Sequence, residues 1–577
     1  MNQDQQVEQF VTFVRTHTGH EMSRREFLRR GMALGLSLPA AIGVLASCGA
    51  APATVTSPTA GPAPAAAAIT PTIEPTPAAQ PSAKGGFGTM VTVAGGDLKS
   101  FNPDFQIDQF AWEAQNAIYS MLITLDWDYN IVGDLAQRWT TSNDGLRLTF
   151  ELHDNAKWHD GKPVTAADVK WTFEKIAAEK TAFASQYLDA LDHIETPDDT
   201  TAVFVLKQPA APLLGFLAWY ATFVMPKHIY DGSDWATNPA NQKPVGSGPF
   251  KFVEHKPGEL TRLEKNPDYY GEGPYLDALV IRVIPDSSTA LQAFRNGEVD
   301  SLVFFTPPLA EVPALEKDPA AKVVRYTYPG LYYLGCNLAR KPLTDHKVRQ
   351  ALAMGINRQE IVDRALNGFG TPESHFYTPA IAWALNQEAS APAYDLEGAM
   401  HLLDEAGFPA GQDGTRMKLV FPYPNLGDEW RNIAQVVQAQ LKALGVGVDL
   451  VELEAAAWQE RLGKQGDFDL SLLDGSHGPD PANLRSRYAS DGTIQFWHYS
   501  NPKVDQLLAA AERLTTQPER AGHYRQAQAL LAADLPTIPL CNQVSPLVYS
   551  AKLAGMPLAE GRGKVGQFNY ALVKVIG

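Results

Sequence analysis

Cysteine is scarce in this chain, and its scarcity excludes whole classes of protein. The 577 residues contain only Cys48, Cys336 and Cys541, and no Cys-x-x-Cys pair. The sequence is therefore neither a disulfide-stapled small domain nor a Cys-ligated zinc module. It also lacks a Gly-x-Ser-x-Gly elbow and a His-Glu-x-x-His motif, so serine and zincin hydrolysis have no local motif. His153 and His159, six apart around a turn, are interpreted as turn residues rather than metal ligands.

Basic residues are outnumbered by acidic ones. The chain has 48 Lys plus Arg against 64 Asp plus Glu, a net charge of -16. Residues 1–47 carry five Arg and four acidic residues, a charge of +1, so the remainder carries -16 minus 1, or -17. Binding to phosphate groups needs basic clusters, so this balance argues against nucleic acid and anionic lipid as partners.

A long hydrophobic run is also missing. The apolar stretch 31–47 contains a proline and is shorter than the roughly 20 residues of a membrane-spanning helix. It follows Arg24 and Arg25, within Ser-Arg-Arg-Glu-Phe-Leu, and ends in Leu-Ala-Ser before Cys48. These features predict a twin-arginine export signal and a lipobox, with cleavage before Cys48 and lipid attached to it. An uncleaved membrane anchor is the alternative.

Residues 49–86 are mostly Ala, Pro and Thr and cannot bury apolar area. We interpret them as an extended tether that reaches on the order of 100 Å from the membrane at about 3.1 Å per residue. The remaining part, 87–577, is too long for a single core and predicts two or three subdomains.

Local signals are densest between residues 136 and 176. The turn Ser-Asn-Asp-Gly at 142–145 precedes the alternating apolar stretch 146–152, which predicts a β-hairpin. Thr165 and Asp168 have the spacing of a capping box, and apolar residues follow at helical intervals, so a helix is expected to begin there.

A series of motifs runs in order through most of the chain. They are Trp139-x-x-Ser142-x-Asp144-Gly145, His159-Asp160-Gly161-x-Pro163-Val164-Thr165, Val245-Gly246-Ser247-Gly248-Pro249-Phe250, Asn266-Pro267-Asp268-Tyr269-Tyr270, Gly297-Glu298-Val299-Asp300, Asp345-x-x-Val348-Arg349 and Leu535-Pro536-x-Ile538-Pro539. Their composition and order resemble extracellular solute-binding protein family 5, the peptide/nickel-type substrate-binding lipoproteins of ABC transporters.

The resemblance implies an α/β fold of two lobes, the type II periplasmic-binding-protein fold, with an extra subdomain in lobe 1 and a two-strand hinge. The expected parts are a signal peptide at 1–47, a tether at 48–86, lobe 1 at 87–330 with a subdomain near 121–225, lobe 2 at 331–540 and a return to lobe 1 at 541–577. Alternating helical and strand-like runs from 396 to 453 fit β-α-β units in lobe 2.

The crossing strands of the hinge are expected near Val323–Asn337 and Ile538–Val544. Cys336 and Cys541 fall one on each and are expected to be neighbours. The two cysteines are either buried free thiols or a disulfide in the hinge, and both interpretations stay open. Alkylation of the unfolded protein distinguishes them, because only free thiols react.

The predicted ligand-binding residues are His477, Asp480, Trp497, Tyr333 and Asn337. In peptide-binding members that resemble this chain, an Asp four residues before the Pro of Asp-Pro pairs with the peptide's α-ammonium. Counting back from Pro481 places His477 there. An imidazole lacks a fixed negative charge, so we expect weak binding of free di- and tripeptides and a preference for a non-peptide, a blocked peptide or an anionic chelate.

Two other interpretations of this loop stay open. Asp474 or Asp480 takes the role of the missing Asp if a local insertion shifts the register, or His477 only caps or packs. Tyr333 and Trp497 would suit stacking on a planar or sugar-like solute.

The resemblance implies capture of a small solute in the cleft between the lobes. The partners it implies are that solute, a peptide or another oligomer or chelate, two membrane permeases with cytoplasmic ATPases, and the membrane through the lipid. No cofactor, metal or nucleic acid is expected, and the protein is expected to be an extracytoplasmic monomer.

An exported α/β hydrolase is the rival class. Gly475-Ser476-His477-Gly478 places a nucleophile beside a base, although sequence neighbours rarely form a triad. A surface adhesin or chaperone is a third interpretation, and retention of a small molecule after purification would distinguish the binder from it.

Overall fold

The computed structural model describes residues 88–576 except 106–108, 127–128, 181–186, 220–221, 303–306, 476 and 557–569. The predicted export signal with Arg24 and Arg25, the lipid site Cys48 and the tether lie outside these residues. In the part of the chain that the structure describes, no helix is both long enough and apolar enough to span a bilayer.

Lobe 1 is built around a core that joins distant parts of the chain. Its buried side chains run from Met90 to Ile281 and resume from Leu547 to Val573. One sheet has the order β1-β10-β9-β8, with β1 parallel to β10 and the other pairs antiparallel. Its strands are β1 (Thr89–Ala94), β10 (Ala278–Val283), β9 (Leu260–Lys265) and β8 (Phe250–Lys256). A small adjoining core contains Val93, Phe294 and Val548.

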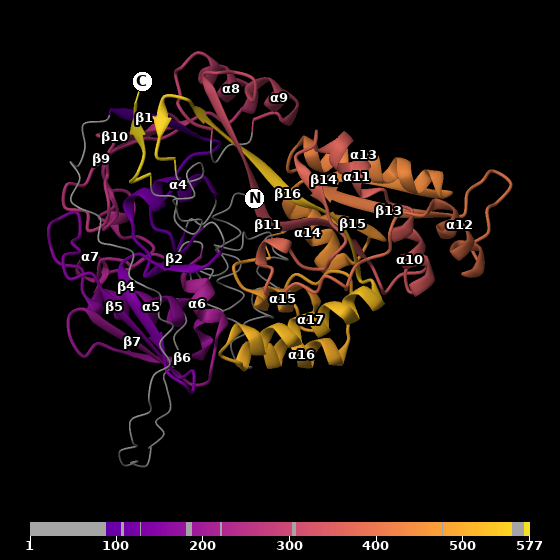
Figure 1. Ribbon diagram of the computed structural model, residues 1–577, viewed down its shortest axis with the longest axis horizontal. Coiled ribbons are helices and arrows are strands. Elements are labelled where there is room, and N and C mark those ends of the chain that lie inside the picture. The colour runs from indigo at the N-terminus through magenta and orange to yellow at the C-terminus, as the bar shows by residue number, and fades with distance from the viewer. Residues whose placement is uncertain are drawn as a thin grey trace, which may run out of the picture. The chain divides into compact units, whose positions relative to one another are not determined.

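A second sheet of lobe 1 has the order β4-β5-β7-β6 (Figure 1). Its strands are β4 (Ala136–Thr141), β5 (Arg147–Leu152), β7 (Thr201–Leu206) and β6 (Leu191–Glu195). The expected hairpin is confirmed as β4 and β5. The expected helix is α5 (Ala166–Glu179), whose capping box pairs Thr165 with Asp168, and its apolar residues Val169, Phe173 and Ile176 are buried.

The other elements of lobe 1 are short. They are β2 (Ile123–Leu125), β3 (Ile131–Gly133), β17 (Leu553–Ala554), β18 (Lys574–Val575), α4 (Gln109–Ile118), α6 (Pro212–Leu217), α7 (Lys227–Tyr230), α8 (Ser287–Arg295) and α9 (Val312–Leu315).

Lobe 2 has its own core, which runs from Leu331 to Cys541. Its main sheet has the order β12-β16-β11-β15, with strands β12 (Gly370–Pro372), β16 (Thr537–Ser550), β11 (Ala321–Cys336) and β15 (Leu470–Leu473). The expected β-α-β unit is confirmed, because β13 (Met417–Pro424) and β14 (Val446–Leu453) are parallel and α13 (Asp428–Ala443) connects them. The remaining helices are α10 (His346–Met354), α11 (Arg358–Ala365), α12 (Leu396–Glu405), α14 (Ala455–Glu460), α15 (Leu484–Tyr488), α16 (Pro502–Arg513) and α17 (Gln517–Asp534).

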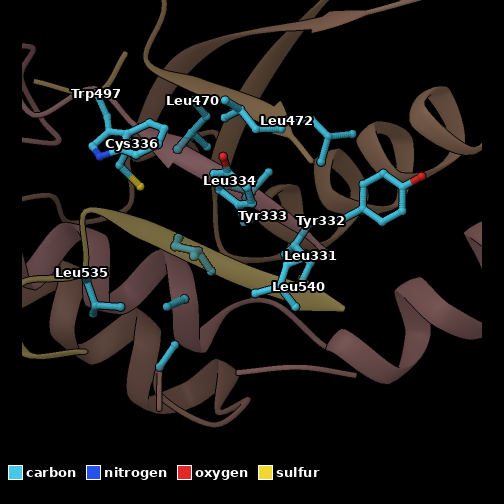
Figure 2. Close-up of a cluster of buried hydrophobic side chains, with 14 of the residues drawn as sticks. Leu331, Tyr332, Tyr333, Leu334, Cys336, Leu470, Leu472, Trp497, Leu535 and Leu540 are labelled. Atoms are coloured by element: carbon cyan, nitrogen blue, oxygen red, sulfur yellow. The ribbon is translucent and has the colours of Figure 1, made fainter. Parts of the chain in front are cut away.

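Two long strands belong to both lobes. β11 and β16 are antiparallel neighbours from the pair Ala321 and Ser550 to the pair Gly335 and Thr537. Tyr326 and Tyr549 pack with the lobe 1 core, whereas the other ends of both strands pack in lobe 2. Figure 2 shows the lobe 2 end, where leucine side chains of both strands cluster and Tyr332 points away from them. These strands are the crossing connections expected from the sequence.

The two cysteines on these strands are not neighbours, which corrects the expectation. Cys541 is opposite Tyr332, four residues before Cys336 along β11. The Cys336 N–H donates to the carbonyl of Pro536 instead. Both are buried free thiols, because two strands can cross at the same place with their cysteines at different register positions.

Candidate functional site

Loops of the two lobes touch at α6. A Cβ on Gly215 of α6 would lie 3.2 Å from the Asp480 Cβ of lobe 2, so only glycine allows this approach without displacement. A Cβ on Gly478 of lobe 2 would lie 3.7 Å from Cε1 of the neighbouring Phe216. Tyr187, also in lobe 1, stacks on Phe216 with ring centroids 3.4 Å apart and planes 8° apart. At this contact lobe 1 therefore presents a glycine and two stacked aromatic rings, and lobe 2 presents Asp480 and its neighbour Pro479.

Charges of lobe 2 reach the phenol of Tyr187. Burial raises the pKa of Tyr187, the carboxylates of Asp480 and Glu512 raise it further, and the Arg487 guanidinium opposes them. Burial also raises the pKa of Glu512, to about 7. The phenol from lobe 1 thus lies among two acidic groups and one guanidinium of lobe 2.

Aromatic rings continue from this contact to the hinge. The hydroxyls of Tyr129 and Tyr326 are 2.8 Å apart and share a hydrogen bond, which connects lobe 1 to β11. The Trp219 ring lies 6.4 Å from that of Tyr129 and 6.4 Å from that of Trp112. Such rings supply apolar contact area with few rotatable bonds, as binding sites for organic solutes do.

His477 lies in the lobe 2 part of this region and is 1% exposed. Its ring stacks on Tyr377, with centroids 5.1 Å apart and planes 9° apart. Its Nδ1 accepts a hydrogen bond from the Thr378 N–H at 3.2 Å. Burial and the nearby Arg487 guanidinium hold the pKa of His477 well below its usual range. The imidazole is therefore neutral, with its proton on Nε2.

Arg487 of α15 is 3% exposed and is central to this region. A Cβ on Gly475 would overlap its guanidinium, which therefore lies directly against the backbone of that loop. Its charge acts on the phenols of Tyr333, Tyr377 and Tyr187. Motif reasoning missed Arg487, because an arginine after an Asp-Pro turn has no local feature that distinguishes it from a surface residue.

The two aspartates proposed as substitutes for the missing family Asp have different partners. Asp480 forms a buried bidentate pair with Arg520, with nitrogen to oxygen distances of 2.7 and 2.5 Å. Asp474 accepts a hydrogen bond from Gln543 Nε2 at 3.0 Å. Burial raises the pKa of Asp474, whereas the Gln543 hydrogen bond and Arg487 lower it. Arg520 therefore neutralises Asp480, and Asp474 faces the hinge strand β16.

The remaining predicted ligand residues lie deeper in lobe 2. Tyr333 and Trp497 are 2% and 0% exposed, and their rings meet edge to face at 6.0 Å (Figure 2). Asn337 donates its amide to the carbonyls of Gly466 and Phe468, at 3.1 and 2.9 Å. His477 and Asp480 thus lie where the lobes face each other, while the other three belong to packed parts of lobe 2.

Among the residues that the structure describes, no group of three or more His, Cys, Asp or Glu side chains is placed to hold a metal ion.

Two cores, two shared strands and an aromatic surface between the lobes define a two-lobed solute-binding protein of the type II periplasmic-binding-protein fold. Comparison with known proteins gives the family. Residues 130–496 match the model for bacterial extracellular solute-binding proteins, family 5 Middle. The chain belongs to this family, as its motifs predict. Members are transport proteins that bind solutes, and the hydrolase alternative has no support.

Named relatives cover most of the chain. It is 29% identical over 472 residues to the oligopeptide-binding protein AppA of Bacillus subtilis, which covers 78% of this chain and 85% of AppA. It is 29% identical to the probable D,D-dipeptide-binding periplasmic protein DdpA of Escherichia coli, over 80% of this chain and 89% of DdpA.

Solved structures agree in fold. The substrate-binding protein CtaP of Listeria monocytogenes matches with a TM-score of 0.77 and 28% identity, over 86% of this chain and all of CtaP. The Helicobacter pylori protein DppA, in complex with the peptide STSA, matches with a TM-score of 0.70 and 28% identity, over 85% of this chain and 99% of DppA.

Proposed function

We propose that this protein is the extracytoplasmic solute-binding component of an ABC importer and that it holds a peptide-sized solute between its lobes. The observation that carries the proposal is the meeting of both lobes beside the shared strands, where Gly215 of lobe 1 lies against Asp480 of lobe 2. Bending of β11 and β16 would open and close this region. Relatives named as peptide-binding proteins support the size of the solute.

The role that each residue has in this proposal follows from its position in the fold. His477, with the rings of Tyr187 and Trp219, contacts the solute, and Asp480 positions the loop through Arg520. Tyr333, Trp497 and Asn337 remain predicted ligand residues that would act from behind this surface. Release to two permeases with cytoplasmic ATPases completes the cycle, with no catalytic step and with the protein as a monomer. The lobe limits stay as proposed from the sequence.

Mass spectrometry of the solute released from the purified mature protein tests this proposal. Scattering is expected to show a more compact particle when solute is bound, and the melting temperature is expected to rise because solute binds only the native state. Absence of any bound or bindable solute, or saturation that changes neither quantity, would contradict the proposed function.

We further propose attachment of lipid at Cys48 and export of the folded protein through the twin-arginine route. Cys48→Ala is expected to move the protein out of the membrane fraction without unfolding it. Replacing Arg24 and Arg25 with Lys is expected to block export. Unchanged membrane association of the first variant, or continued export of the second, would refute the corresponding part.

A further inference from the structure

Lobe 2 contains a cavity that the proposed function does not use. Its volume is about 750 Å³, which is typical of sites for small organic ligands. It is bounded by α12, the loop before β13, the last turns of α13 and the beginning of β14, and its lining includes the charged side chains of Asp413, Arg416 and Lys442. None of the lining residues belongs to β11, to β16 or to the 474–480 loop, so this cavity is separate from the contact between the lobes.

One wall of the cavity contains a buried guanidinium with unused donors. The Arg416 side chain is 8% exposed and pairs with the Asp404 carboxylate. Its Nη1 makes this contact and also donates to the Phe408 carbonyl at 2.8 Å. Its Nε and Nη2 donate to no group among the residues that the structure describes, and neither nitrogen is sealed from solvent. Because a guanidinium binds oxyanions most strongly through two parallel donors, Nε and Nη2 suit an anionic group in the cavity.

The turn at Gly445 brings the end of α13 against this arginine. The Gly445 N–H donates to the Lys442 carbonyl at 3.0 Å, and the Gly445 carbonyl accepts from the Arg416 N–H at 2.7 Å. A Cβ on Gly445 would lie 3.1 Å from the Arg416 Cγ, and its φ of +83° is one that glycine adopts without strain. Lys442 and Arg416 therefore come from distant elements to the same cavity.

The carboxylates near the cavity are balanced by other cations. Asp404 pairs with Arg416. Hydrogen bonds within its own turn lower the pKa of Asp413, and the Lys418 ammonium lowers it further. Lys442, exposed in the last turn of α13, forms no ion pair with any residue in the described part of the chain. The charges at the cavity therefore leave one positive charge in excess, next to the donors of Arg416.

The rest of the lining is apolar. Ala439 and Ala443 lie one turn apart on the same face of α13, and Val446 comes from β14. Met400 of α12 adds a flexible thioether side chain, which adapts to the shape of what it contacts. Small apolar side chains leave room for the body of a ligand, and a few charged donors fix its orientation.

We propose that this cavity is a second ligand site and that it binds a small organic anion, with the carboxylate or phosphate at Arg416 and Lys442 and the apolar part against α12 and α13. The inference does not rest on the proposed function, because no residue of the cavity takes part in the contact between the lobes. A ligand here is held by lobe 2 alone, so it binds whether or not a solute is present between the lobes.

Ligand-observed NMR titration of the full mature chain tests the inference with three probes. They are 4-phenylbutyrate, phenyl phosphate and the neutral 4-phenylbutyramide. A charge-assisted hydrogen bond corresponds to about 10- to 100-fold in affinity. We expect at least one of the two anions to bind, about tenfold or more tightly than the amide, and the comparison of the two anions assigns the site to a carboxylate or a phosphate.

Variants assign the binding to this cavity. Arg416→Met is expected to weaken binding of the anion about tenfold or more, and Lys442→Met about two- to fivefold, since an exposed charge contributes less. Ala443→Phe fills the cavity and is expected to abolish binding. Lys503→Met is the control, because Lys503 is also exposed and forms no ion pair with a described residue but lies on α16. If Arg416→Met does not fold, as judged by its unfolding curve, the other two variants decide the question.

Three results would overturn the inference. They are no binding of either anion by the unaltered protein, equal binding of the amide, and anion binding that Ala443→Phe and Lys442→Met leave unchanged. Retention of the native solute by the same variants is expected in every case, because that solute is proposed to lie between the lobes. Loss of the native solute from Ala443→Phe, with its unfolding curve unchanged, would show that the two sites are not separate and would overturn the inference as well.

Discussion

Removal of Arg520 is expected to destabilise lobe 2 strongly. Its guanidinium is buried, with 4% of the side chain exposed, and pairs with an Asp480 side chain that is 8% exposed. It also donates from Nη2 to the Tyr524 hydroxyl at 2.9 Å and from Nε to the Ala511 carbonyl at 3.0 Å. Arg520→Met would leave a buried carboxylate without its cation, a change that costs about 3–5 kcal/mol.

The design separates loss of the charge pair from loss of packing. Arg520→Met keeps a long apolar side chain, and the double variant with Asp480→Asn removes the stranded charge. The double variant is therefore expected to recover a large part of the loss, because replacing both partners avoids an unpaired charge. Arg138→Met is the control, since Arg138 and Glu151 form an exposed pair with side chains 72% and 40% exposed.

Urea unfolding followed by tryptophan fluorescence at pH 7 measures the effect, with the midpoint and slope compared between variants. The control is expected to change the free energy of unfolding by about 0–1 kcal/mol. A loss for Arg520→Met no larger than that of the control would refute the reasoning, and so would a double variant that is less stable than Arg520→Met alone.

The other predictions concern closure, pH and thiols. Gly215→Val is expected to hold the lobes apart and weaken solute binding, because even a Cβ at this position would lie only 3.2 Å from the Asp480 Cβ of lobe 2. Solution scattering measures the separation of the lobes. The control is Gly522→Val, because a Cβ at that position would meet nothing within 4 Å. Burial raises the pKa of Glu113 from 4.5 to about 7, so the native state binds this proton more tightly than the unfolded state. The free energy of unfolding is therefore expected to fall by on the order of 3 kcal/mol as pH rises from about 4.5 to about 7. Glu113→Gln is expected to remove this pH dependence. A variant whose free energy of unfolding depends on pH as strongly as that of the unaltered protein would contradict this. Burial raises the pKa of the Cys336 and Cys541 thiols to about 12. Iodoacetamide is therefore expected to leave both thiols unmodified in the folded protein and to modify both once the protein is unfolded in the absence of reductant. Absence of modification in the unfolded protein would indicate a disulfide.

The elements that the sequence predicted correctly depend on neighbours along the chain. The hairpin around Asp144 and the capping box at Thr165 are local, since the residues that stabilise them lie within a few positions of one another. The β-α-β unit of lobe 2 follows from hydrophobic periodicity in the same way. Short-range signals of this kind, in a fixed order, were also enough to indicate the family.

The site depended on contacts that no local pattern encodes. The motif count drew attention to His477 but gave no sign of Arg487, whose charge reaches it only because α15 packs against that loop. From the sequence, Asp480 was a predicted ligand residue, but in the fold its carboxylate pairs with Arg520, forty residues away. Cys336 and Cys541 fell on the expected strands, but the register of β11 and β16 separated them. Chain neighbours thus determined the elements and the family, whereas pairing, burial and charge at the site were decided by tertiary packing, because electrostatic and steric effects act through space rather than along the sequence.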